Sequence, residues 1–199
     1  MNKLVRMFTL GIALMMPNVA MASTWTIDQD HSSVGFSIRH LMVSNVKGNF
    51  TRFSGTIDLG DRDFTASKVS ATIDASSIDT NVQKRDDHLR SPDFFDVVKY
   101  PSITFVSKKW SRTGNGKLKV AGDLTMHGKT REVVLKVEPF SKEIHDAWGK
   151  TRRATTATVK INRQDFDISW NKALDAGGVT IGNEVDIVLD IEMIRTGQQ

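Results

Sequence analysis

The residue types best suited to chemistry lie in one short charged stretch in the middle of the chain. His88 stands beside Asp86 and Asp87, and a histidine held by a carboxylate is the usual arrangement of a general base. Arg85 and Arg90 carry fixed positive charge that suits an anion. The same residues would also make an ordinary network of opposite charges on a short helix. We favour the second interpretation, because neighbouring opposite charges on a helix commonly pair.

No other motif has the spacing of a metal, cofactor or catalytic site. The histidines are dispersed, none lie four residues apart, and the chain has no cysteine. Gly122 and Gly128 nearly match a phosphate-binding loop, but five residues separate them, whereas that loop has four. A Gly-x-Ser-x-Gly elbow is also missing. We therefore expect no metal, no cofactor and no enzymatic activity.

The first 22 residues are typical of a cleaved signal peptide. Lys3 and Arg6 precede an apolar run from Met7 to Met16, and Ala20-Met21-Ala22 supplies the small residues of a cleavage site. The run is shorter than the roughly 20 apolar residues that a membrane-spanning helix needs. We therefore expect export to the periplasm, cleavage after residue 22, and one domain over residues 23–199 that does not span the membrane.

Without that segment the chain is nearly neutral. The whole sequence has 27 basic and 23 acidic residues, and the segment contributes only Lys3 and Arg6, so residues 23–199 carry 25 basic against 23 acidic groups. The basic residues are scattered rather than clustered, and we expect no nucleic-acid partner. The absence of cysteine means that packing, not disulfides, must stabilise the domain.

Alternation of apolar and polar residues dominates the rest of the chain and indicates strands with one apolar face. It appears around residues 34–38, 69–73, 103–105, 118–120, 124–126, 133–137, 157–161 and 185–191. Gly114-Asn115-Gly116 and His127-Gly128-Lys129 are turn sequences that predict antiparallel neighbours. About eight antiparallel strands follow. The pattern alone leaves both a two-sheet sandwich and a closed barrel open.

Residues 81–91 interrupt the alternation and predict one short helix. Val82 and Leu89 lie seven residues apart on one side of it, Thr80 or Asn81 would cap its start, and Pro92 would end it.

The residues in and after this helix stand in a distinctive order: Asn81, Arg85-Asp86, His88-Leu89-Arg90-Ser91, Asp93-Phe94-Phe95-Asp96, and Tyr100-Pro101 with Phe105. Two further stretches are His31 to Phe36 with Ile38-Arg39-His40, and Gly122 to Thr130. The first set resembles the signature of the YceI-like family of secreted bacterial lipid-binding proteins, and the two stretches resemble the family's opening strand and its Gly-x-Leu-Thr hairpin. At one position, Asp167, this chain differs from the glycine usual in the family.

The resemblance implies an all-β fold: an extended, antiparallel, eight-stranded, lipocalin-like β-barrel with an elongated hydrophobic cavity and one short helix near residues 81–91. It also implies a periplasmic protein that holds a polyisoprenoid, such as a quinone-like or prenyl carrier lipid, or a similar long-chain amphiphile, for transport, storage or sequestration. Some relatives are associated with a cytochrome b561-type membrane protein, which makes such a protein an expected partner. Monomer and homodimer both remain open.

From the resemblance and the alternation we expect ten apolar side chains to line the cavity. Arg85, Arg90 and His88 are candidate contacts for a lipid head group, whereas the four tryptophans are left out because single tryptophans often pack at barrel ends. The ten are Phe36, Ile38, Phe50, Phe105, Leu124, Met126, Val159, Ile161, Ile187 and Leu189.

Two other functions stay open. One is an isomerase or hydrolase acting on a lipid, with His88 and Asp86 or Asp87 as its acid–base pair. The other is a protein-interaction module with a filled core.

Overall fold

The computed structural model describes residues 22–60, 63–175 and 177–196. All of the expected signal peptide except Ala22 lies outside these residues. The described part holds one α-helix, α1 (Gln83–Arg90), and otherwise strands and short 3-10 turns. None of the described helices is long and apolar enough to span a bilayer.

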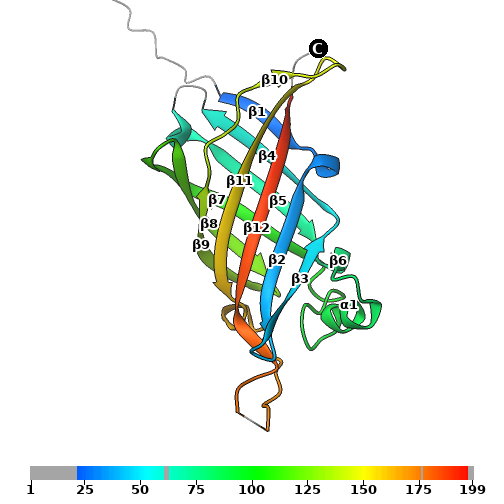
Figure 1. The fold of residues 1–199 in the computed structure, drawn as a ribbon. Coiled ribbons are helices and arrows are strands. Elements are labelled where there is room, and N and C mark those ends of the chain that lie inside the picture. Colours follow the sequence, from blue (N-terminus) through cyan, green and yellow to red (C-terminus); the bar gives the residue numbers. More distant parts are fainter. Residues whose placement is uncertain (1–21, 61–62, 176, 197–199) are drawn as a thin grey trace, which may run out of the picture.

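Eight of the described strands form a closed antiparallel barrel. Around the ring the order is β1, β4, β5, β7, β8, β9, β11, β12, and β12 pairs with β1 again through Trp25 and Arg195 (Figure 1). The predicted all-β, eight-stranded barrel with a single short helix is confirmed. The ring strands are β1 (Ala22–Ile27), β4 (Phe53–Gly60), β5 (Lys68–Asp74), β7 (Ser102–Gly114), β8 (Lys117–Met126), β9 (Lys129–Val137), β11 (Thr151–Asn162) and β12 (Ile181–Arg195).

Further strands lengthen the barrel at one end. The first part of β12 pairs with β2 (Ser33–His40), which pairs with β3 (Ser44–Phe50), and β3 meets the short β6 (Ile78–Asp79) next to α1. At the other end β10 (Ile144–His145) pairs with the start of β11. Figure 1 shows α1 and the β2–β3 turn toward one end of the molecule and β10 at the other. The 3-10 turns are η1 (Gln29–His31), η2 (Phe64–Ala66), η3 (Ala75–Ser77) and η4 (Arg163–Phe166).

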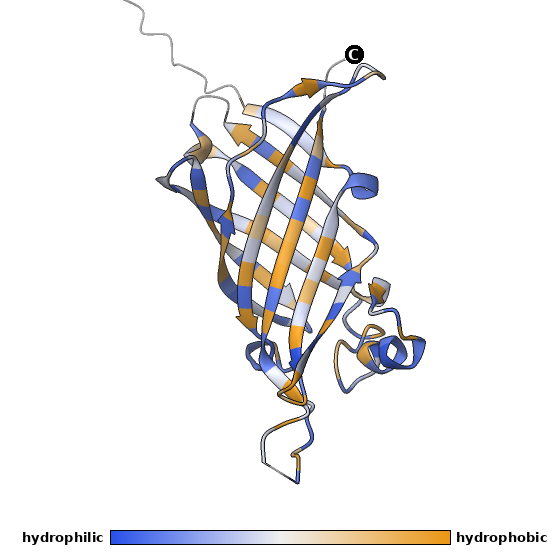
Figure 2. Cartoon of the chain, in the orientation of Figure 1, coloured by the Kyte–Doolittle hydropathy of each residue, from blue (hydrophilic) through white to orange (hydrophobic). Residues whose placement is uncertain are grey.

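Each ring strand turns one face inward because its apolar residues alternate with polar ones. In β8, for example, Leu118, Val120, Leu124 and Met126 are buried, whereas the lysines at 117 and 119 are exposed. The same alternation of hydrophobic and hydrophilic segments is visible along the barrel strands in Figure 2.

The buried residues form two clusters along the barrel. One, toward β10, is packed around Trp25, Leu59 and Leu118, all of which are at most 2% exposed. The other lies toward α1 and includes Phe50 and Phe94. In the second cluster many inward-facing residues are only half-buried, as expected where the interior is not filled.

The helix begins differently from the prediction. Val82 is its N-cap, and no side chain caps it; the expectation that Thr80 or Asn81 would do so is wrong. Instead the buried Asp86 reaches back and accepts hydrogen bonds from the Thr80 backbone N–H at 2.9 Å and hydroxyl at 2.5 Å. Asn81 adopts a left-handed φ of 61°, which places it outside the cap position. The helix spans Gln83–Arg90, within the predicted 81–91, and ends before Pro92 as predicted.

Asp167 takes the left-handed conformation that a glycine would favour. Its φ is 58°, and it caps the C-terminal end of η4. Aspartate tolerates this region better than most residues. Its carboxylate also pairs with Lys129 at 2.9 Å, so the departure from the family pattern leaves the turn intact.

Candidate ligand-binding cavity

An apolar cavity of about 640 Å³ lies inside the barrel. Strands from all around the ring contribute to its wall, together with β2, β3 and one side of α1. Cavities that bind small organic ligands span roughly 300–1,000 Å³. The interior therefore offers room for a ligand rather than a completely filled core.

All ten apolar residues selected from the sequence line this cavity. They come from six strands: Phe36 and Ile38 (β2), Phe50 (β3), Phe105 (β7), Leu124 and Met126 (β8), Val159 and Ile161 (β11), and Ile187 and Leu189 (β12). Their contact with a ligand stays a prediction.

Two tryptophans that the sequence analysis left out also line the wall. Trp110 does so because the β7–β8 register shifts between Ser107 and Lys109, which changes the parity of the inward-facing residues after Phe105. Strict alternation from Phe105 would turn Trp110 outward, so only the observed bulge reveals its position. Trp170 follows η4 in a loop, where no period marks it.

Every charged or titratable side chain on the described wall is basic. No aspartate or glutamate lines the cavity, whereas Arg39, His40, Lys84, Arg85, His88 and Arg163 do. They lie on β2, α1 and η4, at the end of the barrel away from β10. The wall is thus apolar along its length, with positive charge gathered at one end. We call these six residues the basic rim.

Arg163 is the most buried member of the basic rim, at 3% exposure. Its guanidinium donates hydrogen bonds to the Gly182 carbonyl at 2.9 Å and the Ile168 carbonyl at 2.6 Å. No described carboxylate pairs with it, and burial lowers its pKa below the ordinary arginine value. Its hydrogen bond to Gly182 links η4 to β12. Its positive charge lies beside the cavity.

The candidate head-group residues have different surroundings. Arg85 lines the cavity and donates to the Thr80 hydroxyl at 2.7 Å and carbonyl at 2.8 Å. His88 also lines it, edge-on to Phe94 and Trp170. Arg90 is not among the lining residues. Its guanidinium donates to the Ser76 and Ile78 carbonyls, tying the helix end to η3 and β6.

The acid–base pair considered for a lipid enzyme is not brought together. His88 Nε2 lies 2.8 Å from Asp93 Oδ2, in the turn after the helix. Asp86 is engaged with Thr80, and Asp87 accepts from Gln83 at 2.7 Å. The charges of the helix therefore mostly satisfy one another and nearby backbone groups.

The barrel wall also has a weakly paired seam. β9 and β11 pair only through Ala157 with Val137 and Thr158 with Lys136. Beyond that point a hollow opens at the seam. Its lining includes six charged side chains, together with Val133, Val159, Ile161 and Ile187, which also line the cavity. The charged residues of this hollow are Arg131, Glu132, Lys136, Lys160, Asp165 and Asp186.

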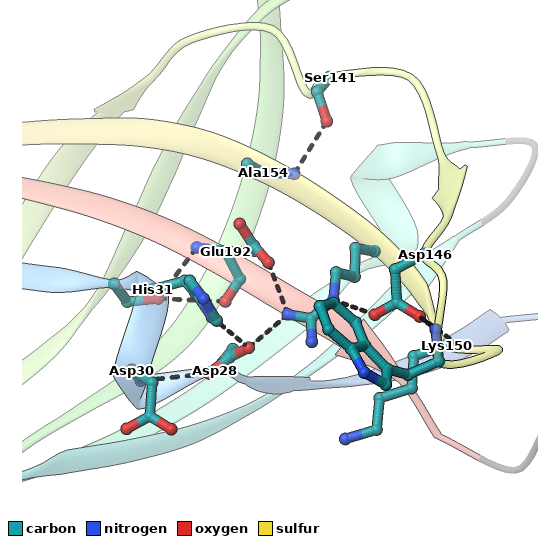
Figure 3. Close-up of polar contacts among 11 residues, drawn as sticks. Asp28, Asp30, His31, Ser141, Asp146, Lys150, Ala154 and Glu192 are labelled. Carbon is teal, nitrogen blue, oxygen red and sulfur yellow. Dashed lines mark hydrogen bonds and ion pairs between the residues drawn. The ribbon is translucent and has the colours of Figure 1, made fainter.

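A dense ion network closes the end of the barrel near β10 (Figure 3). Arg152 on β11 donates to Asp28, to Asp146 at 2.5 Å and to Glu192 on β12 at 2.6 Å. Burial opposes the ionisation of Asp28, but hydrogen bonds from His31 and Arg152 outweigh it and lower the Asp28 pKa to about 2. The hydrogen bond to Asp28 in turn raises the His31 pKa.

Asp28, His31 and Glu192 of this network have ligand atoms within 4.8 Å of one another, the spacing of a metal site. Arg152 already contacts both carboxylates, so its guanidinium offsets part of their negative charge. The arrangement is that of an ion-pair network.

Comparison with known proteins places this architecture in a family. The model of the YceI-like domain matches residues 25–193. A UPF0312 protein of Vibrio parahaemolyticus is 40% identical over 161 residues, covering 80% of this chain and 85% of that protein.

Two solved structures are also similar. The YCEI protein of Campylobacter jejuni is 32% identical, with a TM-score of 0.67 over 80% of this chain and 91% of that one. A polyisoprenoid binding domain from Saccharophagus degradans shares the fold at 16% identity, with a TM-score of 0.61 over 86% of this chain and 98% of that domain. The chain therefore belongs to the YceI-like family.

Proposed function

We propose that this protein binds a polyisoprenoid, or a similar long-chain amphiphile, inside its barrel and carries, stores or sequesters it in the periplasm. The observation that carries the proposal is the 640 Å³ cavity, whose wall is mainly apolar and whose charged or titratable side chains are those of the basic rim. The shared fold with a domain named for polyisoprenoid binding supports the same ligand class.

The size of the cavity suits a long apolar tail. An engineered cavity of roughly 150 Å³ lined by apolar side chains binds benzene, and this interior is about four times larger. Elongated apolar space of that volume is matched by a flexible hydrocarbon better than by a compact polar metabolite. It is also unlike the filled core that a pure interaction module would have.

The energetics are sufficient without any catalytic group. Each buried methylene contributes about 0.8 kcal/mol, so a tail of about 20 carbons would gain roughly 16 kcal/mol before losses. A micromolar complex needs about 8 kcal/mol. The difference can offset the entropy lost when the chain becomes ordered.

The basic rim suits the polar head of such a lipid. Lys84, Arg85 and His88 on α1 offer N–H donors to a carbonyl, hydroxyl or phosphate oxygen. The absence of acidic groups on the described wall favours an acceptor or an anion over a cation. Arg90, committed to backbone carbonyls, would act indirectly by holding the helix in place.

The direct test is to identify what the protein contains. Protein purified from its native host without added lipid is extracted with organic solvent and analysed by mass spectrometry. We expect one class of prenyl or long-chain lipid in near-stoichiometric amount. Protein that is empty and also fails to take up prenyl lipids would contradict the proposal.

A pair of variants on β7 tests where the lipid lies. Phe105→Asp places a charge on the cavity wall and should abolish loading, whereas Lys108→Ala removes an exposed lysine that pairs with Asp123 at 2.5 Å and should not. Circular dichroism and thermal melting check that both variants fold. Equal loading of the two folded variants would place the ligand elsewhere.

The periplasmic location and the membrane partner belong to the same proposal. Fractionation of host cells should place the processed protein in the periplasm with a new terminus at residue 23. Affinity capture from detergent-solubilised membranes would test a cytochrome b561-type partner, and size-exclusion chromatography would decide between monomer and homodimer.

A further inference from the structure

The turn between β2 and β3 exposes three consecutive apolar residues. Leu41 is 40% exposed, Met42 54% and Val43 75%. These residues, which we call the 41–43 tip, belong to a tight turn closed by a hydrogen bond from the Val43 N–H to the His40 carbonyl at 3.1 Å. No described strand or helix covers them.

The backbone of the 41–43 tip is unfavourable for the residues it carries. Leu41 has a φ of 49° and Met42 a φ of 60°, both left-handed. Bulky side chains are rarely found there, and turns with two positive φ values usually use Asn-Gly. Two other hairpin turns of this barrel also have two positive φ values, and both place glycine second: Asn115-Gly116 and His127-Gly128. Strain of this kind is concentrated at functional sites.

The 41–43 tip lies at the end of the barrel that carries the basic rim. The Leu41 N–H donates to the Thr180 carbonyl at 2.8 Å, and Thr180 lines the cavity. His40, the residue before the tip, lines it too. Val82, the N-cap of α1, is 46% exposed and also lines the wall. Figure 1 shows the β2–β3 turn and α1 toward the end opposite β10.

The charges around this end of the barrel are mainly cations without an ion-pair partner. Arg39 donates only to the Met42 carbonyl, at 2.8 Å, and Lys84 and Lys172 have no described ion-pair partner. Asp175 is the acidic residue in the neighbouring loop. An apolar tip bordered by cations is complementary to a membrane surface, where apolar side chains enter the interface and cations meet lipid phosphates.

We propose that the 41–43 tip docks this protein on an anionic lipid bilayer, so that the cavity faces the membrane from which its ligand is drawn. The inference rests on the proposed lipid-binding function and adds the route by which the lipid enters and leaves. The seam between β9 and β11 is a poorer route, because its lining carries acidic as well as basic side chains.

The test is co-sedimentation with vesicles of phosphatidylglycerol and phosphatidylcholine in equal parts, compared with phosphatidylcholine alone. The wild-type protein should bind the anionic vesicles more tightly, and high salt should weaken that binding. Failure of the wild-type protein to bind either vesicle would overturn the proposal.

The decisive variant combines Leu41→Asn and Met42→Gly. These residues suit the left-handed backbone, so the variant should fold at least as stably as the wild type while losing the apolar side chains. We expect its affinity for anionic vesicles to fall about tenfold or more. Binding equal to that of the wild type would overturn the proposal.

Trp148→Ser is the matched control, because Trp148 is an exposed aromatic residue, 81% exposed, in the turn after β10 at the opposite end. It should bind vesicles like the wild type. Loss of binding in this variant, with binding retained in the tip variant, would place the membrane contact at the wrong end for the proposal.

Lipid extraction from the same proteins separates this inference from the proposed function. A tip variant that keeps its lipid but does not bind vesicles supports both. Wild-type protein that contains lipid but ignores vesicles rejects the docking alone. Wild-type protein that contains no lipid and takes up none, yet binds vesicles through the 41–43 tip, rejects the proposed function and leaves the docking standing.

Discussion

At the residue scale, the close packing of the cavity wall requires glycine at residue 48 on β3. A Cβ atom there would lie 2.5 Å from Phe36 Cζ and 2.7 Å from Thr80 Cγ2. Phe36 lies opposite Gly48 on the paired strand β2, and Thr80 lies in the segment that precedes α1. The absence of a side chain at residue 48 therefore lets the ring of Phe36 lie across β3.

We expect Gly48→Ala to lower the free energy of unfolding by about 1–3 kcal/mol, because the added methyl group overlaps Phe36. Gly35→Ala is the control: its Cβ would meet nothing closer than 3.4 Å, and the change should stay within about 0.5 kcal/mol. Urea denaturation measures both. Equal effects of the two substitutions would show that the packing at Gly48 is not tight.

The contact partner of His88 could not be predicted from residue types alone. His88 and the neighbouring aspartates had the composition of an acid–base site, but Asp93 is the carboxylate that contacts His88. The sequence places all these groups within seven residues of one another, from Asp86 to Asp93. It does not specify which carboxylate the ring approaches, because that depends on how the turn after α1 packs against Trp170 through Phe94.

At the element scale, the Arg152 network adds side-chain contacts between strand ends and turns at the end of the barrel where β1, β10, β11 and β12 already pair. It joins the residue after β1, η1, the start of β11, the turn after β10 and the end of β12. Arg152 has an exposed side-chain fraction of 13% and Asp146 one of 8%. Such partly buried, shared ion pairs resist screening better than isolated surface pairs.

The pKa shifts in this network predict a defined pH dependence. The raised His31 pKa stabilises the fold fully below the ordinary value of 6.5, and this contribution is lost as the pH rises through the raised value. The lowered Asp28 pKa stabilises the fold above the ordinary value of 3.8, and this contribution is lost as the pH falls toward about 2.

His31→Gln should therefore be most destabilising, relative to the wild type, between about pH 4 and pH 6.5, where both contributions are present. Above that range the difference in the free energy of unfolding should shrink, because the wild-type histidine loses its charge. Denaturant titrations of both proteins across this range measure the difference. A difference that does not vary with pH would mean that the Asp28–His31 pair does not stabilise the fold through its charge.

At the scale of the whole molecule, the cavity exists because one end of the barrel is packed and the other is not. Trp25, Leu59 and their neighbours fill the end near β10. Toward α1, half-buried side chains such as Phe36, Val185 and Ile187 surround the open volume. Lipid bound there would cover this apolar surface and stabilise the folded state by mass action.

Val159→Trp should fill part of the cavity and lower the amount of extracted lipid per protein, with a smaller rise in melting temperature on adding prenyl lipid. Thr158→Trp changes the neighbouring residue, whose side chain is on the other face of β11, and should leave loading unchanged. Mass spectrometry and thermal melting measure both quantities. Equal lipid content in the two variants would contradict an internal ligand.

Much of this fold was readable from the sequence because strand alternation and turn residues are local signals. The alternation marked β5, β7, β8, β9, β11 and β12 of the ring, together with β2. It did not mark β1 or β4, where polar residues and glycines weaken the apolar pattern. All ten wall residues selected from the resemblance and the alternation line the cavity, and for those on alternating strands the inward orientation follows from strand parity.

The sequence by itself determined the one-sided strands and the single helix, since each depends on neighbouring residues, and the near-neutral charge, which depends on composition alone. Only the tertiary structure decided that β1 and β12 close the ring, that a bulge turns Trp110 inward, and that the charges on the described wall are all basic. These features arise where segments distant in the chain meet. Pairing register and unfilled volume are properties of the assembled barrel, and no local pattern specifies them.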